Sequence, residues 1–132
     1  MDTAKVAIVG FGTIGSGVAR MLVEHRDRIA RHAGRPVELV RVVDPDTSRL
    51  RNFTLPEGVL TSDLAKVTAD PEIEVAVELV GGLEPARTIV LNLLKSGKNI
   101  VTANKALLAE HGQELFNCAR SLGRSIAFEA SV

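Results

Sequence analysis

The chain has 132 residues, a length that suits one domain able to bury about two-thirds of the surface that its unfolded chain exposes. Its 16 Lys and Arg residues balance 16 Asp and Glu residues, so the net charge is zero and the sequence lacks the basic excess typical of nucleic-acid or membrane partners. Cys118 is the single cysteine, which excludes an internal disulfide, and the apolar runs are far shorter than the ~20 residues of a membrane span, so we expect a cytoplasmic domain.

The first half of the chain alternates apolar runs with amphipathic stretches. Residues 5–10 (KVAIVG) predict a buried strand. Apolar residues then recur at the spacing of one long helix, namely Ile14, Val18, Met21, Leu22 and Ile29. Gly34 and Pro36 are typical of the end of that helix. Residues 37–44 predict a second strand, and residues 58–61 a short third strand.

The second half continues the alternation of strands and helices. The predicted elements are a short helix over 62–70, a strand over 73–80, a helix over 84–96 with Pro85 in its first turn, a strand over 98–102, a helix over 104–122 interrupted at Gly112, and a strand over 124–130. Such alternation indicates a parallel sheet with helical crossovers. The sequence therefore predicts one α/β domain over residues 1–132, a doubly wound, mainly parallel sheet of about six strands with the Rossmann fold.

A G-x-G-x-x-G motif lies between the first predicted strand and the first predicted helix. It consists of Gly10, Phe11, Gly12, Thr13, Ile14 and Gly15. Glycines at this spacing let the chain turn, approach a pyrophosphate and pack a helix on a strand, and the helix start offers free N–H groups to phosphates. Glycine turns also end strands for structural reasons, but the flanking strand and helix favour dinucleotide binding. A phosphate-binding loop of the triphosphatases would need lysine where Ser16 stands.

Asp44 closes the second predicted strand, where a carboxylate accepts hydrogen bonds from the adenosine ribose. It follows the glycine motif by more than the typical ~20 residues, and the long first helix accounts for the excess. Asp44 and Asp46 also suit a turn, and both interpretations can hold together. Asp44 would repel a 2′-phosphate and so favours NAD, whereas Arg49 and Arg51 could accept that phosphate. We expect NAD over NADP by a small margin.

The fourth and fifth predicted strands end in further candidate residues. Gly81 and Gly82 either let the backbone approach the nicotinamide ribose or turn the chain into the next helix. Glu78 interrupts an apolar strand, and we interpret it as an end-of-strand charge that reaches solvent. Lys105 falls in the first turn of a helix directly after the strand that ends at Thr102, a position that costs a cation a few tenths of a kcal/mol. This cost favours a nucleotide or a developing alkoxide beside Lys105 over a lysine that points into water.

Four segments resemble, in order and with appropriate spacing, the homoserine dehydrogenases: IVGFGTIGSGVARML, VELVGGLEPA, GKNIVTANKALLAEHGQEL and FEASV. The resemblance covers essentially the whole chain. It implies NAD(P)-dependent interconversion of L-homoserine and L-aspartate 4-semialdehyde, on the pathway to threonine, methionine and isoleucine.

The resemblance also implies roles for individual residues. The glycine motif would bind the pyrophosphate, and Lys105 would contact the cofactor and the reacting centre as a catalytic residue. Together with Asp44, Arg49, Gly81, Gly82 and Thr102, these residues form the expected cofactor site. Glu129 and Val132 match positions at which family members hold a monovalent cation such as Na⁺ through backbone oxygens.

Family members continue into a substrate and dimerisation domain, which we expect to be absent from this chain. The chain would then bind the nicotinamide dinucleotide without turnover, while homoserine and the semialdehyde would bind only with the missing domain, in a full-length homodimer. Two alternatives remain open: a stand-alone module that senses NAD(H) or another nucleotide, since fold does not determine function, and the cofactor domain of another amino-acid dehydrogenase.

Overall fold

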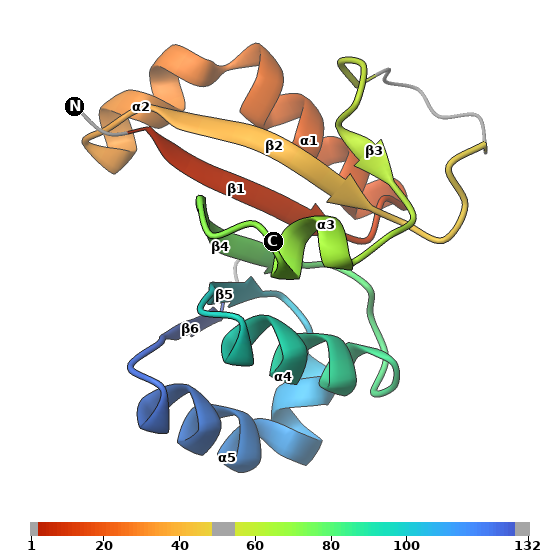
Figure 1. The fold of residues 1–132 in the computed structure, drawn as a ribbon, viewed down its shortest axis with the longest axis vertical. Coiled ribbons are helices and arrows are strands. Elements are labelled where there is room, and N and C mark those ends of the chain that lie inside the picture. The colour runs from red at the N-terminus through yellow and green to blue at the C-terminus, as the bar shows by residue number, and fades with distance from the viewer. Residues whose placement is uncertain (1–2, 49–54, 129–132) are drawn as a thin grey trace.

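The computed structural model describes residues 3–48 and 55–128. Within them, every paired strand belongs to one parallel sheet with the order β3-β2-β1-β4-β5-β6 (Figure 1). The strands are β1 (Ala4–Val9), β2 (Val37–Val43), β3 (Leu60–Thr61), β4 (Ile73–Glu78), β5 (Asn99–Thr102) and β6 (Ile126–Phe128). The helices are α1 (Thr13–Glu24), α2 (Arg26–Ala33), α3 (Ala65–Thr68), α4 (Ala86–Lys95) and α5 (Lys105–Ser121). The predicted doubly wound fold is confirmed.

The strand order reverses between β1 and β4. The chain starts in the middle of the sheet at β1, adds β2 and β3 on one side, and then crosses to add β4, β5 and β6 on the other. Because all the strands are parallel, their carboxyl ends meet at one edge, here called the carboxyl edge, and their starts form the opposite amino edge. In such sheets ligands bind at the carboxyl edge beside the point of reversal.

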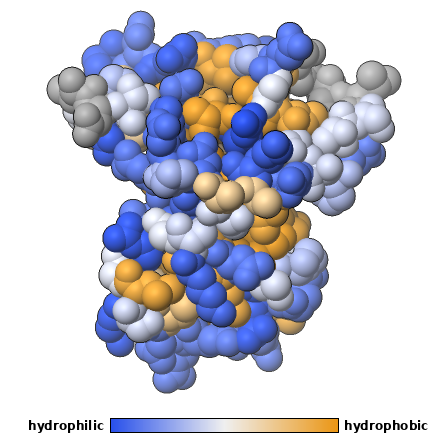
Figure 2. Space-filling model, in the orientation of Figure 1, coloured by the Kyte–Doolittle hydropathy of each residue, from blue (hydrophilic) through white to orange (hydrophobic). Residues whose placement is uncertain are grey.

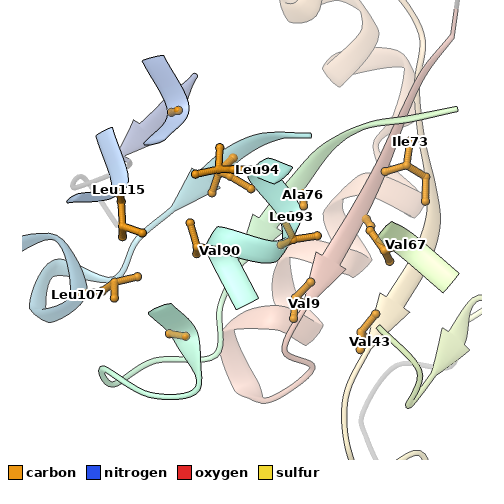
Figure 3. Packing of buried hydrophobic residues seen from close by; sticks show 14 residues of the cluster. Val9, Val43, Val67, Ile73, Ala76, Val90, Leu93, Leu94, Leu107 and Leu115 are labelled. Atoms are coloured by element: carbon orange, nitrogen blue, oxygen red, sulfur yellow. The ribbon is translucent and has the colours of Figure 1, made fainter. Parts of the chain in front are cut away.

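Two apolar cores cover the two faces of the sheet, because alternate side chains of a strand point to opposite faces. Ala7 and Val9 of β1 belong to the core beneath α3, α4 and α5 (Figure 3). Ile8 between them belongs to the core beneath α1. The exposed surface in Figure 2 is mostly hydrophilic, with hydrophobic residues in smaller patches. No helix in the described part of the chain is long and apolar enough to cross a membrane.

The prediction of one long first helix is wrong. Helix α1 ends at Glu24 and α2 begins at Arg26, with His25 in a non-helical conformation between them (φ −118°, ψ 41°). The N–H of His25 still bonds the carbonyl of Met21, and its carbonyl accepts from Ile29 N–H, so the bend leaves the hydrogen-bond ladder largely intact. Apolar spacing does not reveal such a bend. The predicted end of the helix is confirmed, because Gly34 caps α2 in the left-handed conformation at φ 78°.

Two boundary predictions on the later helices also need correction. Helix α5 runs unbroken through Gly112, which is buried with only the side chains of Leu108 and Phe116 near the position of a Cβ. The ~1 kcal/mol that glycine costs in a helix is small beside the packing of a 17-residue helix. Helix α4 starts at Ala86, so Pro85 precedes its first turn and does not lie within it.

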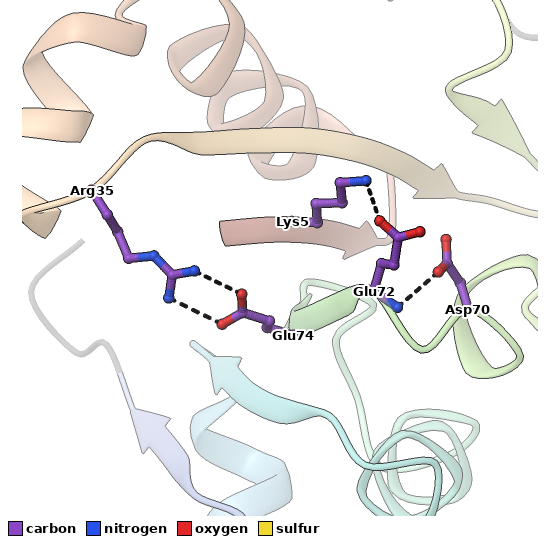
Figure 4. Close-up of polar contacts among 5 residues, drawn as sticks. All are labelled: Lys5, Arg35, Asp70, Glu72 and Glu74. Carbon is purple, nitrogen blue, oxygen red and sulfur yellow. Dashed lines mark hydrogen bonds and ion pairs between the residues drawn. The ribbon is translucent and has the colours of Figure 1, made fainter. Parts of the chain in front are cut away.

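Ion pairs at the amino edge join the start of β4 to β1 and to the residues that precede β2 (Figure 4). Lys5 Nζ lies 2.6 Å from Glu72 Oε1, and Arg35 bonds both oxygens of Glu74 at 2.9 and 3.2 Å. Lys98, just before β5, is only 1% exposed and donates through Nζ to the carbonyl of Asp70. Burial lowers the pKa of the Lys98 ammonium below its ordinary value of 10.5.

Candidate functional site

The glycine motif lies at the carboxyl edge, between β1 and α1, where the strand order reverses. Gly10 has φ 109°, and a Cβ on it would lie 2.7 Å from the carbonyl oxygen of Leu79. A Cβ on Gly15 would lie 2.0 Å from the carbonyl oxygen of Gly10. Packing therefore requires the first and third glycines. The middle one, Gly12, has no atom within 4 Å of its Cβ position, so it leaves open space at the loop.

The start of α1 is arranged to receive an anion beside that open space. Gly12 precedes the helix, and no side chain caps this helix end. The first N–H groups of a helix lack partners within the helix and carry a partial positive charge, so they attract a phosphate. Thr13 and Ile14 are exposed in the first turn, whereas Phe11 is 1% exposed and anchors the loop in the core beneath α1.

Asp44 follows β2 and is bonded to the glycine loop. Its Oδ2 accepts from Phe11 N–H at 2.8 Å, and its Oδ1 accepts from Asp46 N–H at 2.9 Å. Asp46 in turn accepts from the N–H of Ser48 at 3.0 Å. The turn interpretation is therefore confirmed, and the contact of Asp44 with a ribose stays a prediction.

A pocket of about 580 Å³ opens between the glycine loop and the end of β2. Its lining includes Gly10, Gly12, Asp44, Ser62, Val80 and Pro85. It therefore runs from the open glycine, across the carboxylate of Asp44, to the start of α4. This is the place and the composition expected for the adenosine half of a dinucleotide. The candidate residues Arg49, Glu129 and Val132, and also Arg51, lie outside the described residues.

The end of β4 contradicts the prediction for Glu78. Its side chain is fully buried and does not reach solvent. Oε2 accepts from the N–H groups of Val80 at 2.8 Å and Gly81 at 3.2 Å, and Oε1 accepts from the hydroxyl of Thr102 at 2.6 Å. These bonds replace the water that a carboxylate loses on burial. A sequence signal existed, because a glutamate at the end of an apolar strand, three residues before paired glycines, is unusual. Its partner Thr102 became visible only with the register of β4 and β5.

The start of α5 is joined to the same carboxylate. Thr102 Oγ1 accepts from the N–H of Asn104 at 3.0 Å. The side chain of Asn104 caps α5 by accepting from Leu107 N–H at 3.0 Å, and it donates to the carbonyl of Gly82 at 2.7 Å. Lys105 is the first residue of α5 and is exposed. The structure thus brings Gly81, Gly82, Thr102 and Lys105 together at the carboxyl edge, where β4 and β5 end.

Comparisons with known proteins agree with this geometry. The family model described as "Homoserine dehydrogenase, NAD binding domain" matches residues 10–129. The homoserine dehydrogenase of Bacillus subtilis (strain 168) is 39% identical over 132 residues, covering 100% of this chain and 30% of the relative. The homoserine dehydrogenase of Pseudomonas aeruginosa is 42% identical over 134 residues, which cover 100% of this chain and 30% of that relative.

A solved structure extends the agreement to three dimensions. The crystal structure of a homoserine dehydrogenase from Thiobacillus denitrificans has a TM-score of 0.88 and 39% identity, covering 99% of this chain and 30% of that chain. The chain thus spans about 30% of the length of the relatives that it matches. The matched part contains the glycine loop, Asp44, the Glu78 carboxylate and the start of α5. The chain therefore belongs to the homoserine dehydrogenase family, in which it corresponds to the NAD-binding domain.

Proposed function

We propose that this chain binds NAD at the carboxyl edge of its sheet and is the cofactor domain for hydride transfer between L-homoserine and L-aspartate 4-semialdehyde. The observation that carries the proposal is the glycine loop. Packing requires Gly10 and Gly15, whereas Gly12 faces open space beside an uncapped helix start. A loop that served only to turn the chain would not need glycine at the open position.

In this proposal the dinucleotide lies across the point of strand reversal. Its pyrophosphate meets the loop over residues 10–15, and its adenosine ribose meets Asp44. The nicotinamide half then lies toward β4 and β5, where Gly81 and Gly82 expose backbone and Thr102 and Lys105 complete the site. Bound there, the nicotinamide supplies the hydride chemistry.

Lys105 has a distinct part in the proposal. It is exposed at the start of α5, where its ammonium gains from a neighbouring negative charge. An ammonium beside the alkoxide of the reacting alcohol stabilises that charge. Residues that bind the substrate belong, in this proposal, to the part of the relatives that the chain does not match, as does the homodimer contact. The chain by itself then binds nucleotide in the cytoplasm without turnover.

The preference for NAD over NADP is the finer part of the proposal. The carboxylate of Asp44 is held beside the glycine loop by the N–H groups of Phe11 and Asp46, and it lines the pocket in which we propose that the adenosine ribose binds. A 2′-phosphate there would be repelled. A Na⁺ ion at the backbone oxygens of Glu129 and Val132 also stays a proposal. Among the described residues, no group of His, Cys, Asp and Glu side chains could hold a metal ion.

Titration of the chain with NADH and NADPH tests the proposal. The chain has no Trp or Tyr, so the fluorescence of the reduced nicotinamide is read without protein background. We expect saturable binding of NADH, and weaker binding of NADPH. Gly12→Val should abolish binding because its side chain fills the open space at the loop. Gly17→Val is the matched control, since Gly17 is also open but lies outside the motif. Absence of binding of either dinucleotide to the unaltered chain would overturn the cofactor assignment.

A further inference from the structure

A closed ring of hydrogen bonds joins the ends of β4 and β5 at the carboxyl edge. Hydrogen bonds join Glu78 to Thr102, Thr102 to Asn104, Asn104 to Gly82 and Gly81 to Glu78, and the peptide bond between Gly81 and Gly82 closes the ring. We infer that Glu78 is a positioning residue, which holds the Gly81–Gly82 turn and the start of α5 as one unit against the nicotinamide half of the dinucleotide. This inference rests on the proposed function.

The burial of Glu78 is unusual for a charged side chain. Its side chain is 0% exposed on a strand that is otherwise largely apolar. An apolar residue at this position would fill the core without the penalty of removing a carboxylate from water. All three contacts on the carboxylate are donated to it, as an acceptor-only group requires. We therefore attribute the presence of glutamate at this position to its hydrogen bonds with the backbone of the turn and with the hydroxyl of Thr102.

The turn over residues 79–82 needs such support. Gly81 and Gly82 have φ 81° and 71°, and consecutive glycines do not maintain one conformation by themselves. Glu78 binds the turn near its start through Val80 and Gly81, and Asn104 binds its end through the carbonyl of Gly82. With both ends held, the turn is ordered before a ligand arrives, which lowers the entropy lost on binding.

The hydroxyl of Thr102 connects this turn to the helix that carries Lys105. It donates to Glu78 Oε1 and accepts from the N–H of Asn104, so it uses both hydrogen-bonding functions of a hydroxyl group. Asn104 then caps α5 and directly precedes Lys105. Valine has the shape of threonine but neither function, whereas serine retains both. This contrast allows the link to be cut without removing much volume.

A comparison of NADH and ADP binding tests whether the ring positions the nicotinamide site or only supports the fold in general. ADP contains the adenosine and the pyrophosphate but not the nicotinamide half, whereas NADH contains both. We expect Thr102→Val to weaken NADH binding about fivefold, as for the net loss of one ordinary hydrogen bond, and to leave ADP binding within about twofold. Thr102→Ser should recover most of the NADH affinity. Thr88→Val, on α4 outside the ring, is a control for hydroxyl loss.

Glu78→Gln cuts the same ring from the other side. Both carboxylate oxygens of Glu78 accept hydrogen bonds, but the NH₂ of a glutamine can only donate. In one orientation this NH₂ faces the N–H groups of the turn, and in the other it faces the hydroxyl of Thr102, which already accepts from Asn104. We expect the same selective loss of NADH affinity, with calorimetry as the measurement for both ligands. Equal losses for NADH and ADP, or no loss for either, would overturn the positioning role.

Amide NMR of the unaltered chain gives a test that does not depend on the folding of a variant. NADH, but not ADP, should shift the amide signals of Gly81, Gly82 and Lys105. Binding of NADH without shifts at these residues would contradict the inference and the proposed place of the nicotinamide half, but it would leave dinucleotide binding by the chain intact. Failure of the unaltered chain to bind either ligand would instead contradict the proposed function.

Discussion

The two edges of the sheet hold their glutamate side chains in different ways. At the amino edge, Lys5 and Glu72 form an ion pair with side chains 35% and 68% exposed. At the carboxyl edge, Glu78 is fully buried and bonded to backbone N–H groups and a hydroxyl. Water and salt screen the charges of an exposed ion pair, so such a pair contributes little to the free energy of unfolding. A buried carboxylate bonded to backbone N–H groups instead fixes the conformation of that backbone. The candidate site lies at the carboxyl edge, where Glu78 does this.

Lys98 makes the comparison more informative, because it is a buried charge at the amino edge. Its ammonium bonds one backbone carbonyl, that of Asp70, and its pKa is lowered by burial. The Glu78 carboxylate accepts from three donors, whereas Lys98 Nζ donates to one acceptor among the residues that the structure describes. Burial of charge is thus common to both edges, and the number of partners distinguishes them.

The largest effect is expected where two backbones meet in the glycine loop. Gly15→Ala would place a Cβ 2.0 Å from the carbonyl oxygen of Gly10, and we expect it to lower the free energy of unfolding by about 3 kcal/mol. In the same helix, the Cβ added by Gly17→Ala would have no atom within 4 Å, so this change should raise the free energy of unfolding by up to about 1 kcal/mol. Urea denaturation measures both. Equal stabilities of the two variants would show that the loop can relax away from the helix.

Replacing Glu78 tests the carboxyl edge directly. Glu78→Leu leaves the N–H groups of Val80 and Gly81 and the hydroxyl of Thr102 without their acceptor, so we expect a loss of about 2 kcal/mol in the free energy of unfolding. Glu72→Leu is the matched change at the amino edge and should have a much smaller effect. A loss for Glu72→Leu as large as that for Glu78→Leu would remove the distinction between the edges.

The pH dependence of Lys98 provides a third test. Because burial lowers its pKa in the folded chain below 10.5, the unfolded chain binds more protons between the two values, and stability rises with pH across that window. Lys98→Met removes this titration. The stability of the unaltered chain relative to Lys98→Met should therefore increase as the pH approaches 10.5 from below. A difference that does not change with pH would refute the assignment of the buried cation.

Replacement of Lys5 should change stability least, and the contribution of Lys5 to stability should fall with rising pH, whereas that of Lys98 rises. The hydrogen bond and charge of Glu72 raise the pKa of Lys5 above 10.5. Its contribution to stability is therefore fully present below 10.5 and is lost as the pH rises through the higher folded value. Lys5→Met should change the urea midpoint only slightly, and less still at high salt, because both side chains are solvated. A large effect that persists in high salt would contradict this account of the amino edge.

Local features of the chain predicted most of the fold. Apolar runs separated by amphipathic stretches indicated the parallel sheet, and Gly34 marked the end of a helix, because strand and helix periodicity are properties of neighbouring residues. The bend at His25 and the unbroken helix through Gly112 escaped prediction, because the surrounding packing decides both.

The glycine loop, the strands that flank it and the family resemblance that the comparisons confirm could all be read from the order of the residues alone. Three findings needed the folded chain: which glycines packing requires, that Asp44 bonds the loop, and that Glu78 is buried. The physical reason is separation along the chain. Glu78 and Thr102 are 24 residues apart, and they meet because the register of β4 on β5 pairs them at the carboxyl edge. Register depends on the packing of the whole sheet, and no local pattern contains it.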